Sequence, residues 1–211
     1  AILGIGAAWH EEEHRGYGFD FPPVRERLDR LEEALQVCRA MFTQEAPSFQ
    51  GRYYQIHEVL NMPRPLQAGG PAIMVGGSGE LRTLRLVAQY ADMCNVIGGV
   101  EFVRHKMQVL LRYCEGIGRN PAEIIKTRLG ALVVAPTRAE AESKAAEYRA
   151  ARGMDEARFR SYVTAGDPEG VVQQVQEYFD AGLDGMIFNM PFVHDLDSVK
   201  LAGETLSTRF S

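Results

Sequence analysis

The chain has 211 residues, of which 45% are apolar and 24% are charged, so it has enough material for one sizeable globular core. Its 23 basic and 28 acidic residues give a net charge of -5 without any block of Lys or Arg, which argues against a nucleic-acid-binding surface. No stretch approaches the roughly 18 apolar residues of a membrane span, and three cysteines without metal-ligand spacing favour buried thiols in a cytoplasmic protein.

The chain opens inside an apolar run, residues 1–6, which ends at a glycine and predicts a buried strand. Because no methionine precedes this run, we expect further sequence upstream. Residues 10–24 are polar and rich in glycine and proline, which is typical of an excursion loop. Apolar residues at three- and four-residue steps then predict an amphipathic helix over 24–43. The aromatic pair Tyr53 and Tyr54, followed by prolines, predicts a small hairpin and a covering loop that extend to about residue 70.

A regular alternation of strands and helices begins at residue 72. Short apolar runs predict strands over 72–75, 92–97, 126–135 and 184–190. Helical periodicity predicts helices over 79–90, 100–117, about 138–151, 168–181 and 195–207. Thr137 and Glu140 form a capping box at the start of the third of these helices. Asp167 and Pro168 begin the fourth, and Gly182 ends it. The segment before Asp167 carries no predicted element.

This alternation implies parallel βαβ units within a single α/β domain that spans residues 1–211. Five core strands are predicted, near residues 2, 72, 92, 128 and 185, whereas a closed parallel barrel needs eight. Two architectures remain open. The chain forms either an open doubly wound sheet or the C-terminal part of a (β/α)8 barrel whose first three units are absent.

The strand at 72–75 runs into the next helix through three glycines and a serine, which are Gly76, Gly77, Ser78 and Gly79. Glycines carry no Cβ and let a phosphate approach the backbone N–H groups, and the serine hydroxyl adds a donor. The turn matches neither GxGxxG nor a Walker A sequence, so it is also compatible with simple punctuation. Its position at the carboxyl end of a parallel strand favours a site for a phosphorylated ligand. Arg82 and Arg85 either add charge to this site or face solvent.

Residues at the other strand ends are predicted to line the same mouth, because the carboxyl ends of parallel strands meet at one edge. They are Ala7, Ala8, Trp9, His10, Asn95 and Asn189. Trp9 is the only tryptophan, and it either walls a flat ring or caps the core under the excursion loop. The two alanines leave room for a planar ligand or simply fit a tight rim.

The sequence HEEEH at 10–14 has two alternative interpretations. Its histidines at i and i+4 resemble a metal-binding pair, but without HExxH or a cysteine partner we expect an exposed helical turn and no metal site. His10 is the candidate general acid or base, because it follows a strand end. The sequence offers no Ser/His/Asp arrangement and no nucleophile elbow, so we expect a bound cofactor to carry the chemistry.

Four blocks cover the chain from residue 2 to about residue 190, and they are LGIGAAWHEEEHRGYGFDFPPVRERLDRLEEALQVCRAMF, FQGRYYQIHEVLNMPRPLQ, PAIMVGGSGELRTLRLVAQYADMCNV and GLDGMIFNM. In order and spacing they closely resemble the bacterial luciferase-like monooxygenase superfamily, in particular its coenzyme F420-dependent oxidoreductase branch. The resemblance implies a (β/α)8 TIM barrel of the luciferase-like type that is entered at its fourth strand, so that only strands four to eight are represented.

The same resemblance implies where a cofactor lies. A deazaflavin or flavin is expected to lie flat at the C-terminal mouth, with its phosphate at the glycine turn, residues 76–79. The segment 7–10 is then near the ring, and Tyr17 falls where some members approach the phosphate. Many relatives have glycine where this chain has Ala8, which is expected to alter the backbone near the ring.

The function implied by the resemblance is an oxidoreductase that transfers hydride between reduced coenzyme F420 and a small organic substrate. An FMN-dependent monooxygenase that uses dioxygen is the alternative within the family. A hypothesis of another class is a truncated barrel without activity that persists as an oligomer or a binding protein, because missing strands leave exposed edges. We expect a cytoplasmic homo-oligomer, a dimer, that contacts neither nucleic acid nor membrane.

Overall fold

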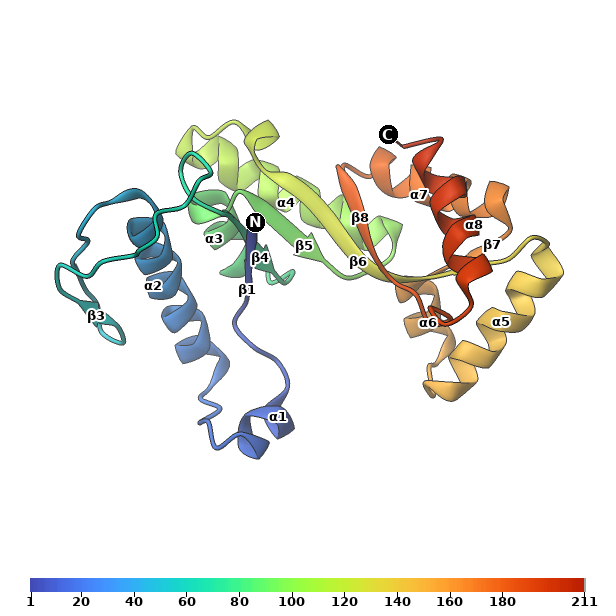
Figure 1. The fold of residues 1–211 in the computed structure, drawn as a ribbon, viewed down its shortest axis with the longest axis horizontal. Coiled ribbons are helices and arrows are strands. Elements are labelled where there is room, and N and C mark those ends of the chain that lie inside the picture. Colours follow the sequence, from blue (N-terminus) through green and yellow to red (C-terminus); the bar gives the residue numbers. More distant parts are fainter. Residues whose placement is uncertain (211) are drawn as a thin grey trace. The chain divides into compact units, whose positions relative to one another are not determined.

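The computed structural model describes residues 1–210 and shows parallel strands alternating with helices (Figure 1). The fold class predicted from the sequence, parallel α/β, is confirmed. The described residues form two compact units, which are Ala1–Asn95 with Val109–Ile124, and Val96–Gln108 with the chain from Ile125 onward. Within residues 1–210, no helix is long and apolar enough to cross a membrane.

The first unit is built on three parallel strands, which in spatial order are β1 (Ile2–Ile5), β4 (Ala72–Gly76) and β5 (Met93–Val96). Ile5 pairs with Val75, and the next residue of β4, Gly76, pairs with Asn95. The carboxyl ends of the three strands are therefore in register along one edge.

The chain between β1 and β4 forms two helices and a hairpin, namely α1 (Glu11–Gly16), α2 (Val24–Thr43), β2 (Phe49–Gln50) and β3 (Gln55–Ile56). The long helix and the hairpin lie where the sequence predicts them, and the excursion loop contains α1. The apolar stripe of α2 buries Leu31 and Leu35. α3 (Thr83–Tyr90) connects β4 to β5, and a short 3-10 helix, η1 (Pro121–Glu123), follows α4 (Val100–Ile117).

Glu33, in the middle of α2, holds the turn of the hairpin. Its carboxylate accepts hydrogen bonds from the backbone N–H groups of Arg52, Tyr53 and Tyr54 at 2.8, 2.8 and 3.0 Å. Residue 51 is glycine because a Cβ there would overlap the Glu33 carboxylate. Partial burial raises the pKa of Glu33, but the three N–H donors outweigh it and leave that pKa below its ordinary value. The hairpin is thus fastened to α2 by one ionised side chain.

The second unit is built around β6 (Ile125–Val134), which pairs in parallel with β8 (Gly185–Asn189) through residues 127–131 and with β7 (Val163–Gly166) through residues 131–134. Its helices include α5 (Arg138–Ala151), α6 (Glu156–Tyr162), α7 (Pro168–Asp180) and α8 (Leu196–Ser207). The predicted capping box of α5 is present. Asp167 caps α7 through a 2.9 Å bond from Gly170 N–H, and Gly182 follows the helix at a φ of +102°.

All five predicted strands are present, and the structure adds α6 and β7 in the segment that carried no predicted element. These elements have seven and four residues, which is too short for a sequence period to show. Phe159 and Tyr162 of α6 pack against the core cluster that contains Ala131 and Val163. This tertiary packing, which local sequence does not reveal, stabilises the two short elements.

One arginine of β6 is fully buried in the second unit. Arg128 donates from Nε to the carbonyl of Gly98 and from Nη2 to that of Ser161, both at 2.8 Å. Its guanidinium lies 4.3 Å from the centre of the Tyr178 ring. Burial lowers the pKa of this guanidinium. A strand predicted from apolar residues therefore also carries a cation that ties the loop before α4 to the end of α6.

Candidate functional site

The carboxyl ends of β1 and β4 bring two of the predicted segments together. Gly6 lies against Gly76, because a Cβ at Gly6 would stand 3.2 Å from the carbonyl oxygen of Gly76. On the other side of β4, Gly77 donates its N–H to the carbonyl of Asn95 at 3.0 Å. The segment after β1, the glycine turn after β4 and Asn95 thus share one edge of the sheet, as the sequence predicts.

Asn189 lies in the second unit, at the last position of β8. Its side-chain amide donates to the hydroxyl of Tyr162 at 2.9 Å. Within that unit, Asn189 connects β8 to the end of α6. Its predicted place at the mouth stays a prediction.

The glycine turn exposes its own backbone. Its three glycines are exposed, whereas Val75 before them and Thr83 after them are buried. Gly77 has a φ of +129°, a conformation that strongly favours glycine. A Cβ at Gly79 would lie 2.9 Å from Oγ1 of Thr83. Both positions therefore require glycine, and the bare surface that results can be approached closely by a phosphate-sized group.

The helix after the turn begins later than predicted. α3 starts at Thr83 rather than at Gly79, and residues 80–82 form a separate turn. Its closing bond runs from Leu84 N–H to the carbonyl of Gly79, five residues back, at 3.0 Å. The low helix propensity of glycine favours this wider turn. As a result the hydroxyl of Thr83 lies beside the glycines. The sequence analysis does not predict this polar group at the turn, although threonine is a common residue at helix starts.

The two arginines that follow the turn are paired with α2. Arg82 lies 2.8 Å from Asp29 and 3.0 Å from Glu32, and Arg85 lies 3.2 Å from Glu32. The bond to Asp29 raises the pKa of the Arg82 guanidinium above its ordinary value. The positive charge is therefore largely neutralised within the unit. The buried Nε–H of Arg82 nevertheless has no acceptor in residues 1–210, so one donor close to the turn in sequence is unsatisfied.

The segment after β1 bends sharply at Ala8, which has a φ of +60°. This left-handed conformation costs a non-glycine residue about 1–2 kcal/mol. Arg27 of α2 donates from Nη1 to the carbonyls of both Ala7 and Ala8. Trp9 is 85% exposed, so the interpretation that it caps the core is wrong, and its ring stands edge-on to the ring of His10 at 5.0 Å.

His10 is the N-cap of α1, and HEEEH forms an exposed helical turn as expected. Its Nδ1 accepts the N–H of Glu13 at 3.0 Å, so the neutral ring carries its proton on Nε2. Tyr17 ends α1 and is 74% exposed. Within residues 1–210, His, Cys, Asp and Glu side chains do not gather in groups of three or more that could hold a metal ion.

A cavity of about 280 Å³ lies between the end of β1, the excursion loop and the first turns of α2. Its lining includes Ala7, Ala8, His14, Phe19, Arg27 and Tyr54. The bent segment after β1 thus has open space against it, and a side chain of α2 reaches across that space to hold it.

Residues 1–162 match the family model of the luciferase-like monooxygenases, and the chain belongs to this family. The chain is 28% identical to the F420-dependent glucose-6-phosphate dehydrogenase of Kineococcus radiotolerans and 27% identical to that of Amycolatopsis mediterranei. Each comparison covers 90% of this chain but only 63% of the relative. The chain therefore spans less than two thirds of the length of the curated relatives it matches.

Solved structures share the fold. The coenzyme F420-dependent tetrahydromethanopterin reductase of Methanopyrus kandleri superposes with a TM-score of 0.81 at 16% identity, over all of this chain and 74% of that one. A monooxygenase from Streptomyces bottropensis gives 0.80 at 19% identity, over 100% and 69%. An F420-dependent secondary alcohol dehydrogenase, in complex with an F420–acetone adduct, gives 0.80 at 16% identity, over 98% and 68%. At these identities the likeness establishes the fold, and the family resemblance inferred from the sequence blocks is confirmed by the family model.

Proposed function

We propose that the chain is part of an oxidoreductase that transfers hydride between reduced coenzyme F420 and a small organic substrate. The observation that carries this proposal is the bare glycine turn at the carboxyl end of β4, in a chain that belongs to the luciferase-like family. The curated relatives that are named F420-dependent glucose-6-phosphate dehydrogenases support the choice of cofactor. F420 would supply the hydride chemistry, and the protein would bind and orient it.

The glycine turn fits the phosphate end of such a cofactor. Because Gly77 gives its N–H to Asn95, binding would fall to the residues after it, with the hydroxyls of Ser78 and Thr83 as additional donors. Since acidic residues of α2 neutralise the nearby guanidinium groups, the anion would be held mainly by N–H and O–H dipoles.

We place the ring of the cofactor at the other end of the same edge, against Ala7, Ala8 and Trp9, and keep Tyr17, the C-cap of α1, as a candidate contact of the phosphate. The exposed indole of Trp9 supplies a flat apolar face. His10 is the proposed proton donor or acceptor. The neutral ring already carries its proton on Nε2, so it can take up a further proton only at Nδ1, and that would break the bond from the N–H of Glu13.

In the whole protein we propose that both units belong to one (β/α)8 barrel domain, of which this chain supplies the fourth to eighth strands as β1, β4, β5, β6 and β8, with β7 as an additional short strand. The parallel strands, the half-exposed Ile2 of β1 and the greater length of the relatives support this arrangement. We also propose a cytoplasmic homodimer. Cys38, Cys94 and Cys114 are thiols rather than disulfides within residues 1–210, and the last two are buried, which fits a reducing compartment.

An FMN-dependent monooxygenase is the second candidate, because monooxygenases are among the solved structures that share the fold. Both FMN and F420 carry a phosphate ester, so the glycine turn by itself does not separate the two. The two cofactors differ in the ring and in the tail, so binding experiments must distinguish them there.

The test is a titration of the full-length protein with F420 and, separately, with FMN, followed by fluorescence quenching. Gly77→Leu should weaken binding about tenfold or more, because its Cβ would lie 3.2 Å from Cγ2 of Thr83 and its φ is +129°. Gly116→Leu is the matched control, since a Cβ at that position on α4 meets nothing within 4 Å. Binding of FMN alone would move the assignment to a monooxygenase, and binding of neither would favour a barrel without activity that serves as a binding protein.

A further inference from the structure

The guanidinium of Arg27, in the first turn of α2, donates hydrogen bonds only to backbone carbonyls. Nη1 donates to Ala7 at 3.0 Å and also to Ala8, and Nε donates to Pro22 at 2.9 Å. The guanidinium carbon stands 4.0 Å from the centre of the Phe21 ring. Within residues 1–210, no carboxylate lies within ion-pair distance of Arg27.

Neighbouring arginines in this unit are used differently. Arg30, one turn further along α2, pairs with Glu26, and Arg82 pairs with Asp29. The guanidinium of Arg27 therefore binds peptide carbonyls instead of a carboxylate. Hydrogen bonds from a charged donor are about twice as strong as neutral ones, so the two carbonyls after β1 are held firmly.

Two successive carbonyls reach one nitrogen only where the chain turns. In an extended strand, consecutive peptide carbonyls point to opposite sides. The left-handed φ of +60° at Ala8 turns the second carbonyl toward the first, and Nη1 donates to both. A residue keeps a strained conformation when its neighbours hold it there. At Ala8 the neighbour that does so is Arg27.

We infer that Arg27 is a positioning residue for the ring end of the cofactor: it holds the bend at Ala8 and so sets the backbone of residues 7–9 against the ring. The inference rests on the proposed cofactor site. Arg27 contacts the glycine turn through none of its hydrogen bonds, so its loss should leave the phosphate end intact. Its charge also polarises the Ala7 and Ala8 peptides, which makes the N–H groups of Ala8 and Trp9 stronger donors.

The test compares Arg27→Met and Arg27→Lys with Arg25→Met in the full-length protein. Arg25 is the matched control, because it lies exposed on the same turn of α2 and its side chain makes no hydrogen bond or ion pair with residues 1–210. Each variant is titrated with F420, and both the Kd and the absorption and fluorescence of the bound deazaflavin at saturation are recorded. Amide hydrogen exchange of residues 7–10 is measured without cofactor.

We expect Arg27→Met to shift the spectrum of the bound ring toward that of free F420 while the Kd changes by no more than a few-fold. Exchange at Ala8 and Trp9 should become faster, because the bend that Arg27 holds opens more often without it. Arg27→Lys keeps the charge and one donor, so it should restore part of the spectral shift. Arg25→Met should match the wild type in every readout.

A second comparison uses Ala8→Gly. Glycine adopts the left-handed conformation without strain, so the spectral effect of Arg27→Met should be smaller when residue 8 is glycine. Equal effects in both backgrounds would overturn the link between Arg27 and the bend.

Spectra and exchange rates in Arg27→Met that equal those of Arg25→Met would overturn the inference while leaving the cofactor site in place. A parallel loss of thermal stability and affinity, with an unchanged spectrum of the remaining complex, would reduce Arg27 to a structural role and overturn it too. A wild-type protein that binds neither F420 nor FMN would instead overturn the proposed function, and with it the cofactor part of the inference.

Discussion

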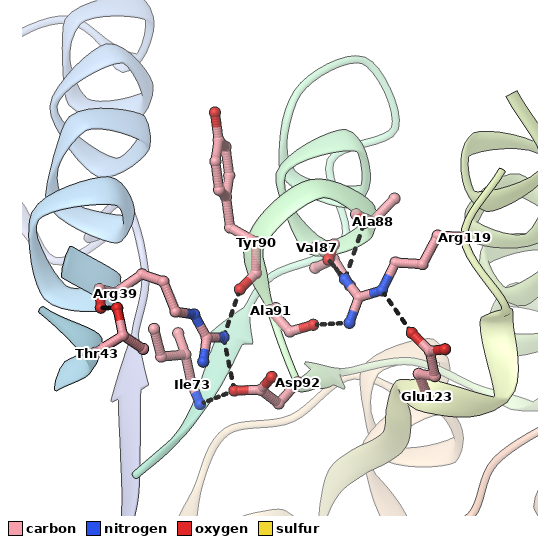
Figure 2. Close-up of polar contacts among 10 residues, drawn as sticks. All are labelled: Arg39, Thr43, Ile73, Val87, Ala88, Tyr90, Ala91, Asp92, Arg119 and Glu123. Carbon is pink, nitrogen blue, oxygen red and sulfur yellow. Dashed lines mark hydrogen bonds and ion pairs between the residues drawn. The ribbon is translucent and has the colours of Figure 1, made fainter. Parts of the chain in front are cut away.

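The two ends of the β1–β4–β5 sheet are built in opposite ways. At the amino ends, Arg119 donates to the carbonyls of Val87, Ala88 and Ala91 at 3.3, 2.9 and 2.8 Å, and so closes the last turn of α3 (Figure 2). At the carboxyl ends, the chain leaves three exposed glycines, an alanine in the left-handed conformation and an exposed tryptophan.

A second arginine reaches the amino ends from α2, on the other side of α3 in Figure 2. Arg39 donates to the carbonyl of Tyr90 at 2.9 Å and to the carboxylate of Asp92 at 2.8 Å. Asp92 in turn accepts the N–H of Ile73 at 2.8 Å, which joins the start of β4 to the start of β5. Arginine side chains and Asp92 satisfy backbone groups at this end, whereas the glycines of residues 76–79 at the other end stay exposed. That division, stability at the amino ends and chemistry at the carboxyl ends, is general for parallel βα folds.

α2 serves both ends. Arg27 and Arg39 are twelve positions apart, which is about 18 Å along a helix, so one helix fixes the bend after β1 and the start of β5. Glu33, between them, holds the hairpin. The sequence predicts α2 only as an amphipathic helix. In the structure, three of its side chains also hold three separate segments of the chain in place.

The largest loss of stability is expected from a substitution at the amino ends of these strands. Arg119→Met should lower the free energy of unfolding by about 2–4 kcal/mol, because it leaves helix-end carbonyls without a donor. Thermal and denaturant unfolding measure the loss, and Arg112→Met, at an exposed position of α4, is the matched control. The Kd for F420 should not change. A variant that lost affinity as much as stability would show that the two ends are not separate.

A smaller effect is expected from Ala8→Gly at the carboxyl ends. Glycine removes about 1–2 kcal/mol of left-handed strain, and its entropy in the unfolded chain offsets part of that gain. The net result should be a stabilisation of about 0.5 kcal/mol, measured by unfolding. Ala7→Gly is the control and should not stabilise, since φ is not positive at that residue. Destabilisation by Ala8→Gly would mean that the bend carries no strain.

The smallest effect concerns Glu33, between the two ends. Because the pKa of Glu33 is lower in the folded protein than in the unfolded chain, its contribution is fully present above the ordinary pKa of a glutamate, about 4.3, and is lost as the pH falls through the folded value. At neutral pH the Glu33→Gln variant should therefore be less stable to unfolding than the wild type. Below about pH 4 this difference in the free energy of unfolding should disappear. Unfolding midpoints of both proteins across this range test the sign. A difference that grows as the pH falls would contradict it.

Much of the fold was open to prediction because its signals are local. The stripe of α2, the capping box at Thr137 and the cap at Asp167 depend on residues within one or two turns of each other, and each was found where the sequence indicates. α6 and β7 escaped because seven and four residues show no period of their own. The start of α3 moved from Gly79 to Thr83 because turn geometry, which hydrophobic pattern does not encode, decided it.

For the candidate site, the sequence by itself determined the glycine turn, the small residues after β1 and the family to which they belong. These features depend on residue type and on order along the chain, because only glycine tolerates the φ of Gly77 and only parallel strands bring such ends to one edge. The tertiary structure alone decided the partners of the charges. It directed Arg82 to Asp29, Arg119 to the end of α3, and Arg27 to the bend at Ala8. Long side chains reach residues 19 to 53 positions away, and which acceptor they meet depends on how the elements pack, not on any spacing in the sequence.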